Sequence, residues 1–377
     1  MIQGFATEEG TTRFKEKHRE SIAQDHFRSV NGLNLTSVGM GTYLGEPDNT
    51  TDQMVTDAVK LSIQTGAINV IDTAINYRSQ KAERSIGKAL KELIESGEFK
   101  RDEIFISTKN GYITNDADVT MEFWAYIQNT LIKTGIINAD DISSGYHCMT
   151  IPYLADQLER SRKNLGVECI DLMYLHNSVE GQVQDVGIIK FIEMLKEVFQ
   201  FYEEKRKEGK IRYYGMATWN CFRVHKDNME YLNLKNVVNI AKEVGGEHNG
   251  FRFVQLPFNI AMSEVLTERN QEVDGETISF LETAKKLGIG VFTSIPLLQG
   301  QLLNKNTMPK FANIDSPALR CLQFVRSAGT IPLVGHKIME HVQENLEIAK
   351  ISPFNESDFN DLLTKLITPS DHSCNCK

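Results

Sequence analysis

Residues 50–74, TTDQMVTDAVKLSIQTGAINVIDTA, contain the pattern that decides the fold. Thr50 and Gln53 have the spacing of a helix capping box, and apolar residues then recur at a helical period as far as Gly66, a natural helix end. The run Ile68–Ile71 that follows predicts a buried strand, which ends at the charged residue Asp72. The stretch therefore predicts one helix followed directly by one strand.

The same alternation continues along the whole chain. With Ile68–Ile71, the short β-rich runs are Leu35–Gly39, Ile104–Lys109, Ile170–Leu175, Ile211–Gly215, Phe253–Leu256, Gly290–Thr293 and Thr330–Val334. Helical patterns separate these runs, as before Gly209, where Phe191, Leu195 and Val198 share one face. Eight such units favour an α/β fold that closes into a (β/α)8 TIM barrel over an open doubly wound sheet.

No linker or change of composition divides the chain into two large domains. We expect a polar N-terminal extension over residues 1–27, the barrel over residues 28–350, and a C-terminal segment over residues 351–377. The last residues, with Cys374 and Cys376, are expected to form a flexible tail.

A long insertion, Asn110–Thr150, follows the third predicted strand. A long segment on this side of a barrel commonly forms a lid or a substrate wall, although a surface insertion without a role in the site is the alternative. We expect it to cover the mouth of the barrel. The side chains expected to form an apolar wall there are Tyr112, Phe123, Trp124 and Tyr126, with His147 as the next polar residue at the pocket.

Composition and charge exclude several classes of function. The 377 residues are 41% hydrophobic and 24% charged, and the net charge of −9 argues against a nucleic acid or an anionic membrane surface as partner. The chain has no apolar run of transmembrane length and no N-terminal signal segment, so a cytoplasmic protein is expected. Six scattered cysteines do not form a disulfide framework, and no metal site is expected.

The polar residues at the predicted strand ends form a chemically coherent set, because catalytic groups of such barrels lie at the C-terminal ends of the strands. These residues are Asp72, Tyr77, Lys109 and His176. Carbonyl reduction needs a proton donor as the oxygen gains charge, and a nearby ammonium lowers the pKa of a tyrosine that donates this proton. We therefore expect Tyr77 to be the donor, Lys109 to tune it, Asp72 to hold Lys109, and His176 to bind the carbonyl oxygen.

Several motifs together resemble the aldo-keto reductase family over about Gly32 to Ile348. They are Gly39–Tyr43 (GMGTY), Ile71–Tyr77 (IDTAINY), Glu83–Gly87 (ERSIG), Ile106–Lys109 (ISTK), Asp171–His176 (DLMYLH), Gly209–Gly215 (GKIRYYG) and Glu344–Leu346 (ENL). The resemblance implies a barrel that binds NADP(H) across the strand ends and reduces a small aldehyde or ketone with the four residues named above. NADPH is the expected cofactor, and NADH is a possible substitute.

The resemblance also implies which residues contact the cofactor. The nicotinamide end is assigned Gly41, Thr42, Thr218, Gln255 and Ser294, and the adenosine-phosphate end is assigned Lys337, His341 and Asn345. Three positions depart from the family pattern. Ala217-Thr218 stands where the family has Ser-Asn, Ser294 replaces a stacking aromatic residue, and His341 replaces an arginine, so the contacts of the nicotinamide and the cofactor preference are expected to differ.

Two alternatives remain beside the reductase. One is a regulatory barrel that binds NADPH as a sensor with little turnover, which the altered nicotinamide contacts favour and the four catalytic residues oppose. The other is a metal-dependent barrel hydrolase that would use Asp72, His147 and His176, although these do not form a convergent set of metal ligands in the sequence.

Overall fold

Eight parallel strands close into a barrel in the computed structural model, which describes residues 1–304 and 309–367. In order around the barrel they are β3 (Gly39–Gly41), β4 (Val70–Asp72), β5 (Phe105–Asn110), β6 (Ile170–His176), β7 (Ile211–Ala217), β8 (Phe251–Pro257), β11 (Gly290–Ser294) and β12 (Ile331–Gly335). β12 pairs with β3 and completes the ring. The predicted (β/α)8 barrel with an insertion after its third strand is confirmed.

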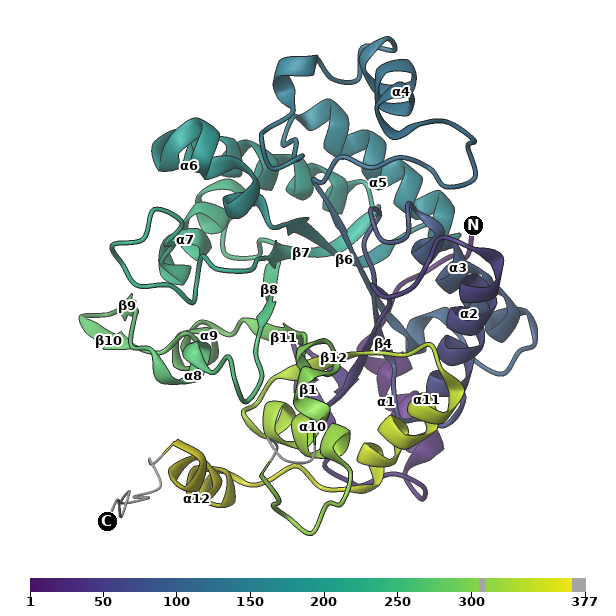
Figure 1. The fold of residues 1–377 in the computed structure, drawn as a ribbon, viewed down its shortest axis with the longest axis vertical. Helices are drawn as coiled ribbons and strands as arrows, with labels where there is room; N and C mark the ends of the chain where they lie inside the picture. The colour runs from purple at the N-terminus through teal and green to yellow at the C-terminus, as the bar shows by residue number, and fades with distance from the viewer. Residues whose placement is uncertain (305–308, 368–377) are drawn as a thin grey trace, which may run out of the picture.

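Helices surround the strands on all sides (Figure 1). They are α2 (Asn49–Gln64), α3 (Lys81–Glu95), α5 (Ile151–Leu165), α6 (Ser178–Lys207), α7 (Leu234–Gly245), α9 (Phe280–Leu287), α10 (Pro317–Ser327) and α11 (Met339–Leu346). Additional helices are α1 (Glu8–His18), α4 (Phe123–Ile127), α8 (Glu264–Thr267) and α12 (Glu356–Ile367). Short helical turns are η1 (Arg101–Glu103), η2 (Gln128–Ile132), η3 (Ala139–Asp141), η4 (Leu298–Leu303) and η5 (Glu347–Lys350).

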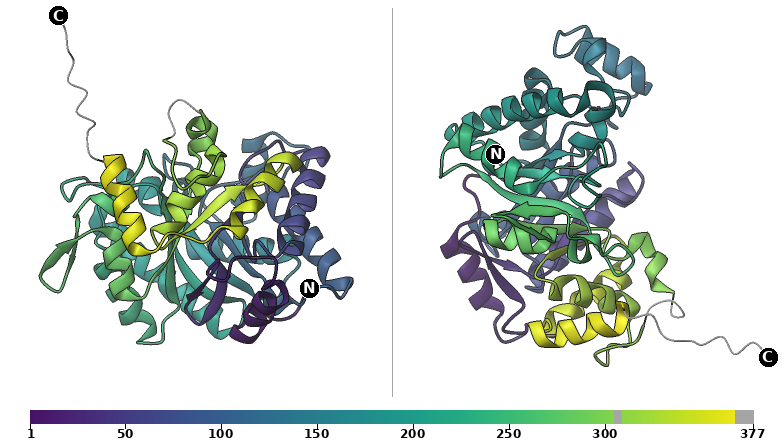
Figure 2. Two further views of the ribbon diagram at one scale, coloured as in Figure 1. Left: turned by 90° about the horizontal axis from the view of Figure 1, so that it is seen from below. Right: turned by 90° about the vertical axis from the view of Figure 1, so that its left-hand side faces the viewer.

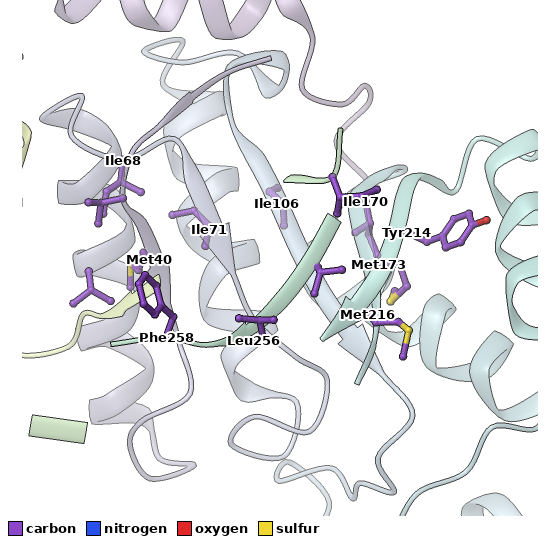
Figure 3. Close-up of a cluster of buried hydrophobic side chains, with 14 of the residues drawn as sticks. Met40, Ile68, Ile71, Ile106, Ile170, Met173, Tyr214, Met216, Leu256 and Phe258 are labelled. Atoms are coloured by element: carbon purple, nitrogen blue, oxygen red, sulfur yellow. The ribbon is translucent and has the colours of Figure 1, made fainter. Parts of the chain in front are cut away.

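The main core lies between the strands and the ring of helices. Outward-facing strand residues such as Ile71, Ile106, Met173 and Leu256 are fully buried there (Figure 3). Burial of aliphatic side chains along alternate positions of each strand holds the helices on the barrel, because each buried side chain stabilises the fold by about 1.5–3 kcal/mol.

A second core fills the interior of the barrel and closes its lower end. An antiparallel hairpin of β1 (Phe27–Val30) and β2 (Leu33–Thr36) contributes Leu33 and Leu35, which belong to one buried cluster with Phe105, Phe253 and Phe292. The N-terminal elements, coloured purple, lie together at this end of the barrel (Figure 2). The opposite end, where the strands finish, is therefore the end left for a site.

Two local predictions near the N-terminus are wrong. The run Leu35–Gly39 is not a barrel strand, because residues 35 and 36 belong to the hairpin and the first barrel strand is the three-residue β3. The side chain that caps α2 is that of Asp48, which accepts a hydrogen bond of 2.7 Å from the Thr51 amide, so Thr50 lies inside the helix. An aspartate is as good a cap as a threonine, and sequence spacing does not choose between neighbouring candidates.

The remaining segments lie at the periphery. A second hairpin, β9 (Gln271–Val273) with β10 (Glu276–Ile278), precedes α9. α12 ends the part of the chain that the structure describes, and the predicted tail with Cys374 and Cys376 lies outside the described residues.

Candidate active site

A cavity of about 470 Å³ opens at the C-terminal ends of the barrel strands. Predicted site residues that line it are Gly41, Thr42, Asp72, Tyr77, His176, Thr218, Gln255 and Ser294. The parallel register places them at one level, since Gly41 pairs with Asp72, His176 with Ala217, and Ala217 with Gln255. The strand-end rule therefore brings together residues that are far apart in the sequence.

Lys109 is the centre of the polar groups below this cavity. Its ammonium donates to Asp72 Oδ2 at 2.5 Å, to the Thr73 carbonyl oxygen at 2.7 Å, and to Tyr77 Oη at 3.3 Å. The side chain is completely buried, and all three partners come from β4 and the loop after it. An ammonium that is removed from water needs such a set of acceptors.

Asp72 is held as firmly as the lysine. Its Oδ1 accepts hydrogen bonds from Ser107 Oγ at 2.7 Å and from Gln255 Nε2 at 2.9 Å. Because its Oδ2 is bonded to Lys109, both oxygens have partners. The carboxylate is thereby fixed as an acceptor that keeps the lysine in one position.

The effect of this environment on Tyr77 differs from the prediction. Burial raises the pKa of Tyr77 above its usual value, and this effect outweighs the Lys109 ammonium, which lowers it. Burial alone would lower the pKa of Lys109, but the charges of Asp72 and Tyr77 and their hydrogen bonds together raise it. Tyr77 is therefore a protonated phenol beside a charged lysine: Lys109 lowers the pKa of Tyr77 as expected, but burial outweighs this effect.

His176 faces the phenol from the end of β6. Its ring lies 5.8 Å from the Tyr77 ring and 4.9 Å from the Tyr112 ring, between centroids, and both contacts are edge-to-face. Burial, with the charge of Lys109, lowers the pKa of His176 well below its usual value, so the imidazole is neutral. A neutral imidazole with one N–H is able to donate a hydrogen bond to a carbonyl oxygen.

His147 supports His176 from below and does not line the cavity. Its Nε2 is 2.8 Å from the His176 carbonyl oxygen, and its Nδ1 is 3.1 Å from the Gln182 amide nitrogen. Because the Gln182 amide donates to Nδ1, the ring proton is on Nε2 and is donated to the carbonyl. Burial lowers the pKa of His147 to about 4. The structure thus places His147 behind the strand end instead of at the pocket.

The loop after Tyr77 has an unusual backbone. Arg78, Ser79 and Gln80 all have positive φ values, of 48°, 50° and 75°. Such a run is uncommon for residues other than glycine and is held here by an ion pair of 2.6 Å between Arg78 and Asp52 of α2. The turn ends at Gln80, the N-cap residue of α3.

The residues predicted for the adenosine-phosphate end lie beyond β12 and do not line this cavity. Lys337 is half-buried, and its side chain lies beside Gly45. On α11, His341 is exposed, and Asn345 is buried with an Oδ1 that has no hydrogen-bond partner among the described residues. The segment nevertheless continues directly from Gly335, which does line the cavity.

Most of the insertion packs away from the cavity. Tyr126, Ile127 and Leu131 form a separate apolar cluster with Tyr153 of α5 and other residues of the insertion, and α4 lies outside the ring of helices (Figure 1). Trp124 is 47% exposed and contacts Phe123 and Tyr146 instead of the cavity. The predicted aromatic wall is wrong for Phe123, Trp124 and Tyr126, because an amphipathic helical segment buried its apolar side against α5; only Tyr112, close to the end of β5, lines the cavity.

Sequence reasoning missed several residues that line the cavity. Tyr43 follows β3, Asn177 follows His176, and Trp219 comes two residues after the end of β7. Asn177 Nδ2 donates to Tyr112 Oη at 3.2 Å, which joins two of the lining side chains. The strand-end rule that selected the four predicted catalytic residues would also have selected Asn177 and Trp219.

The described residues lack features that two other classes of protein require. Over residues 1–304 and 309–367, no group of three or more His, Cys, Asp and Glu side chains could hold a metal ion. No helix within the same ranges has both the length and the apolar character needed to cross a membrane.

Comparison with known proteins identifies the family of the chain. A family model described as the aldo/keto reductase family matches residues 37–313, so the chain belongs to the aldo/keto reductase family. The chain is 25% identical over 209 residues to the uncharacterized oxidoreductase YqkF of Bacillus subtilis and 24% identical over 218 residues to aldose reductase C of Dictyostelium discoideum. These regions cover 55% and 57% of this chain, and the chain spans only 52% and 58% of the two relatives.

Solved structures share the fold. An aldo/keto reductase from Klebsiella pneumoniae, determined in complex with NADP and acetate, superposes with a TM-score of 0.58 at 19% identity. The match covers 92% of this chain and 96% of that one. At this identity the likeness establishes the barrel and nothing finer.

Proposed function

We propose that the protein reduces an aldehyde or ketone to an alcohol with NADP(H), and that Tyr77 donates the proton. The observation that carries this proposal is the contact of Lys109 with both Asp72 and Tyr77 beneath a cavity at the strand ends. Membership of the aldo/keto reductase family supports an oxidoreductase.

Each of the four residues has a distinct task in this proposal. The neutral imidazole of His176 donates to the carbonyl oxygen and orients the substrate, while the protonated Tyr77 supplies a proton as negative charge develops there. Lys109 stabilises the phenolate that remains, and Asp72 keeps the lysine charged and in place. A bound reduced nicotinamide would supply the hydride.

The residues present fit a nicotinamide cofactor. Thr218 and Gln255 line the cavity as polar side chains suited to a carboxamide, and Gly41 lines it at the end of β3 without a side chain. The buried, unpartnered Oδ1 of Asn345 and the half-buried cation Lys337 supply an acceptor and a charge for the adenosine-phosphate end. The Klebsiella relative was solved with NADP, which supports NADPH as the cofactor.

A sensor that binds NADPH with little turnover is the second candidate. It is favoured by the nicotinamide side of the cavity, where Ser294 is small and the Thr218 hydroxyl is already bonded to Glu180 at 2.8 Å. The two candidates differ in a single measurable quantity, which is the rate of NADPH oxidation with saturating carbonyl compound.

The test is a panel of aldehydes and ketones assayed with NADPH and NADH in parallel, using the wild-type protein and Tyr77→Phe. We expect Tyr77→Phe to lower the rate of carbonyl reduction by about 10²–10⁴-fold, because only the proton donor is removed. The dissociation constant for NADPH, measured by fluorescence, should change by less than about threefold, which corresponds to roughly 0.7 kcal/mol. Turnover of Tyr77→Phe within tenfold of wild type would contradict the role of Tyr77; wild-type binding of NADPH without turnover would favour the sensor.

A further inference from the structure

The carboxylate of Glu180 lies behind the wall of the cavity that is made by the end of β7. Glu180 is in the first turn of α6, four residues after His176. Its Oε1 accepts three hydrogen bonds, from Thr218 Oγ1 at 2.8 Å, the Trp219 amide at 2.8 Å, and the Asn220 amide at 2.5 Å. Thr218 and Trp219 line the cavity, so a single layer of residues, hydrogen-bonded to the carboxylate, separates it from the cavity.

Within residues 1–304 and 309–367, no cation forms an ion pair with this carboxylate. Its Oε2 is buried and has no hydrogen-bond partner among the described residues, and none of their ion pairs includes Glu180. Arg223 is bonded to the same loop, because it donates to the Trp219 carbonyl oxygen at 3.0 Å. Its ion pair, however, is with Glu264. Amide donors and the N-terminus of α6 stabilise the negative charge where it is.

The other charges at this end of the barrel do not offset it. Lys109 is already paired with Asp72, and His176 is neutral because burial and Lys109 lower its pKa. Burial raises the pKa of Tyr112, and the Glu180 charge acts in the same direction, which indicates that the charge is felt by a residue lining the cavity. A surplus of one negative charge therefore remains beside the cavity.

From this geometry we propose that Glu180 distinguishes the two redox forms of the nicotinamide and binds the oxidised form more tightly. The inference rests on the proposed function, which places the nicotinamide against Thr218 and Gln255. The oxidised ring carries a positive charge that the reduced ring lacks, and an uncompensated carboxylate in a poorly solvated wall attracts it. Glu180 does not touch the reacting atoms and is a specificity-determining residue.

The same charge favours reduction over oxidation within the complex. A bound reduced nicotinamide would supply a hydride, with its two electrons, to the carbonyl carbon while Tyr77 donates its proton to the oxygen, so the nicotinamide would be left with a positive charge as the alcohol forms. Tyr77 then regains a proton from solvent. Stabilising the cationic ring shifts the equilibrium between the bound states toward the alcohol.

The experiment measures dissociation constants for NADP⁺ and NADPH without any carbonyl substrate. The chain has two tryptophans, Trp124 and Trp219, so a Trp124→Phe background leaves Trp219 in the cavity wall as the reporter of binding. In this background Glu180→Gln removes the charge and keeps the shape, Glu180→Asp keeps the charge and withdraws it from the loop amides, and Glu230→Gln is the control. Glu230 accepts from the Asn220 side chain in the same loop, at 2.8 Å.

We expect Glu180→Gln to weaken NADP⁺ relative to NADPH by roughly tenfold, as removal of one poorly screened charge at about 10 Å would. Glu180→Asp should weaken both forms by similar factors, and Glu230→Gln should leave their ratio unchanged. Glu180→Ala removes the charge without burying an unpartnered amide, so it should give the same shift in ratio if Glu180→Gln folds poorly.

Equal weakening of both forms in Glu180→Gln and Glu180→Ala would overturn the inference and leave Glu180 as a cap of the loop after β7. Failure of the wild-type protein to bind either form would overturn the proposed function, and this inference with it. The two failures are therefore distinguishable.

Discussion

The acidity of Tyr77 is set by two opposing effects, and burial is the larger one. Burial destabilises the phenolate more than the nearby ammonium of Lys109 stabilises it, so the pKa of Tyr77 is raised. A proton donor whose pKa is raised stays protonated across the physiological range. The lysine then stabilises the negative charge that appears on Tyr77 during the reaction more than it affects Tyr77 in the resting protein.

The pH profile of carbonyl reduction follows from these pKa shifts. Tyr77 must be protonated, and its raised pKa keeps it so until the pH exceeds about 10, its usual value. His176 must be neutral, and its lowered pKa keeps it so well below pH 6.5. We therefore expect kcat/KM for reduction to be flat from about pH 6 to 9 and to fall only at higher pH.

The measurement is a steady-state profile in constant ionic strength buffers, with enzyme stability checked at each pH. A loss of rate centred near pH 6.5 would show that His176 titrates in its usual range, contrary to the neutral imidazole of the structure. A loss centred near pH 8 would show that Lys109 outweighs burial at Tyr77.

Lys337 provides a test of cofactor preference. It is half-buried next to Gly45, no ion pair among the described residues includes it, and α11 begins two residues later. If it binds the 2′-phosphate, Lys337→Ala should weaken NADPH by about ten- to a hundredfold, since a charged hydrogen bond contributes about 1.5–3 kcal/mol. NADH lacks this phosphate and serves as the internal control; equal losses for both cofactors would place Lys337 elsewhere.

At the scale of elements, the insertion after β5 divides into two parts with different surroundings. Its first residues follow β5 and place Tyr112 against His176, whereas α4 and η2 bury their apolar sides against α5. Anchoring both ends of a segment beside a site does not decide where its middle packs. Its own apolar residues decide that, because burial against the nearest apolar face stabilises it most.

Two aromatic residues of this insertion form a matched pair for testing it. We expect Tyr112→Ala to change the ranking of carbonyl substrates, with roughly tenfold shifts in kcat/KM, because a positioned wall of the cavity is removed. Trp124→Ala should leave the ranking unchanged, because Trp124 contacts Phe123 and Tyr146 outside the cavity.

Kinetics on five or more aldehydes of different size, with both variants, would separate these outcomes. A change of ranking in Trp124→Ala comparable to that in Tyr112→Ala would show that the distal insertion reaches the substrate after all.

The elements differ in how well the sequence predicts them. Strands such as Ile170–His176 are long, apolar and followed by a strong helix pattern, so local periodicity is sufficient to find them. β3 has three residues, two of them glycine, and resembles a turn; its strand conformation depends on pairing with β4 and β12. The hairpin strand β2 next to it has the stronger local signal, and the predicted run Leu35–Gly39 therefore begins in the hairpin.

At the scale of the molecule, closure of the barrel creates contacts at the site that the sequence does not reveal. Strand-end chemistry predicted that Asp72, Tyr77, Lys109 and His176 converge, because parallel strands of one barrel finish on one face. It did not predict the bond between Asp72 and Gln255, which are 183 positions apart, or the bond between Glu180 and Thr218. Such pairs depend on register around the whole ring, and no local pattern contains this information.

Besides His18, which is less deeply buried, the fold buries four histidines that lie in separate parts of the chain. Burial lowers the pKa of His26 to about 3, of His147 to about 4 and of His336 to about 3, and that of His176 well below its usual value. In the unfolded chain these groups would bind protons near pH 6.5. The native protein therefore binds fewer protons than the unfolded chain between pH 6.5 and about 4.

The free energy of unfolding must then fall as the pH falls through this window. The stability that the neutral histidines contribute is fully present above pH 6.5. Each histidine contributes a loss of about 1.4 kcal/mol per pH unit once the pH is well below 6.5. We expect urea unfolding at pH 7.5, 6.0 and 5.0 to show a progressive loss of several kcal/mol, measured by circular dichroism. His147→Gln removes one of the four groups while a side-chain amide remains to donate to the His176 carbonyl, so its stability should depend less steeply on pH. Stability that stays constant between pH 6.5 and 5.0, or an unchanged slope in His147→Gln, would show that these imidazoles become protonated inside the folded barrel.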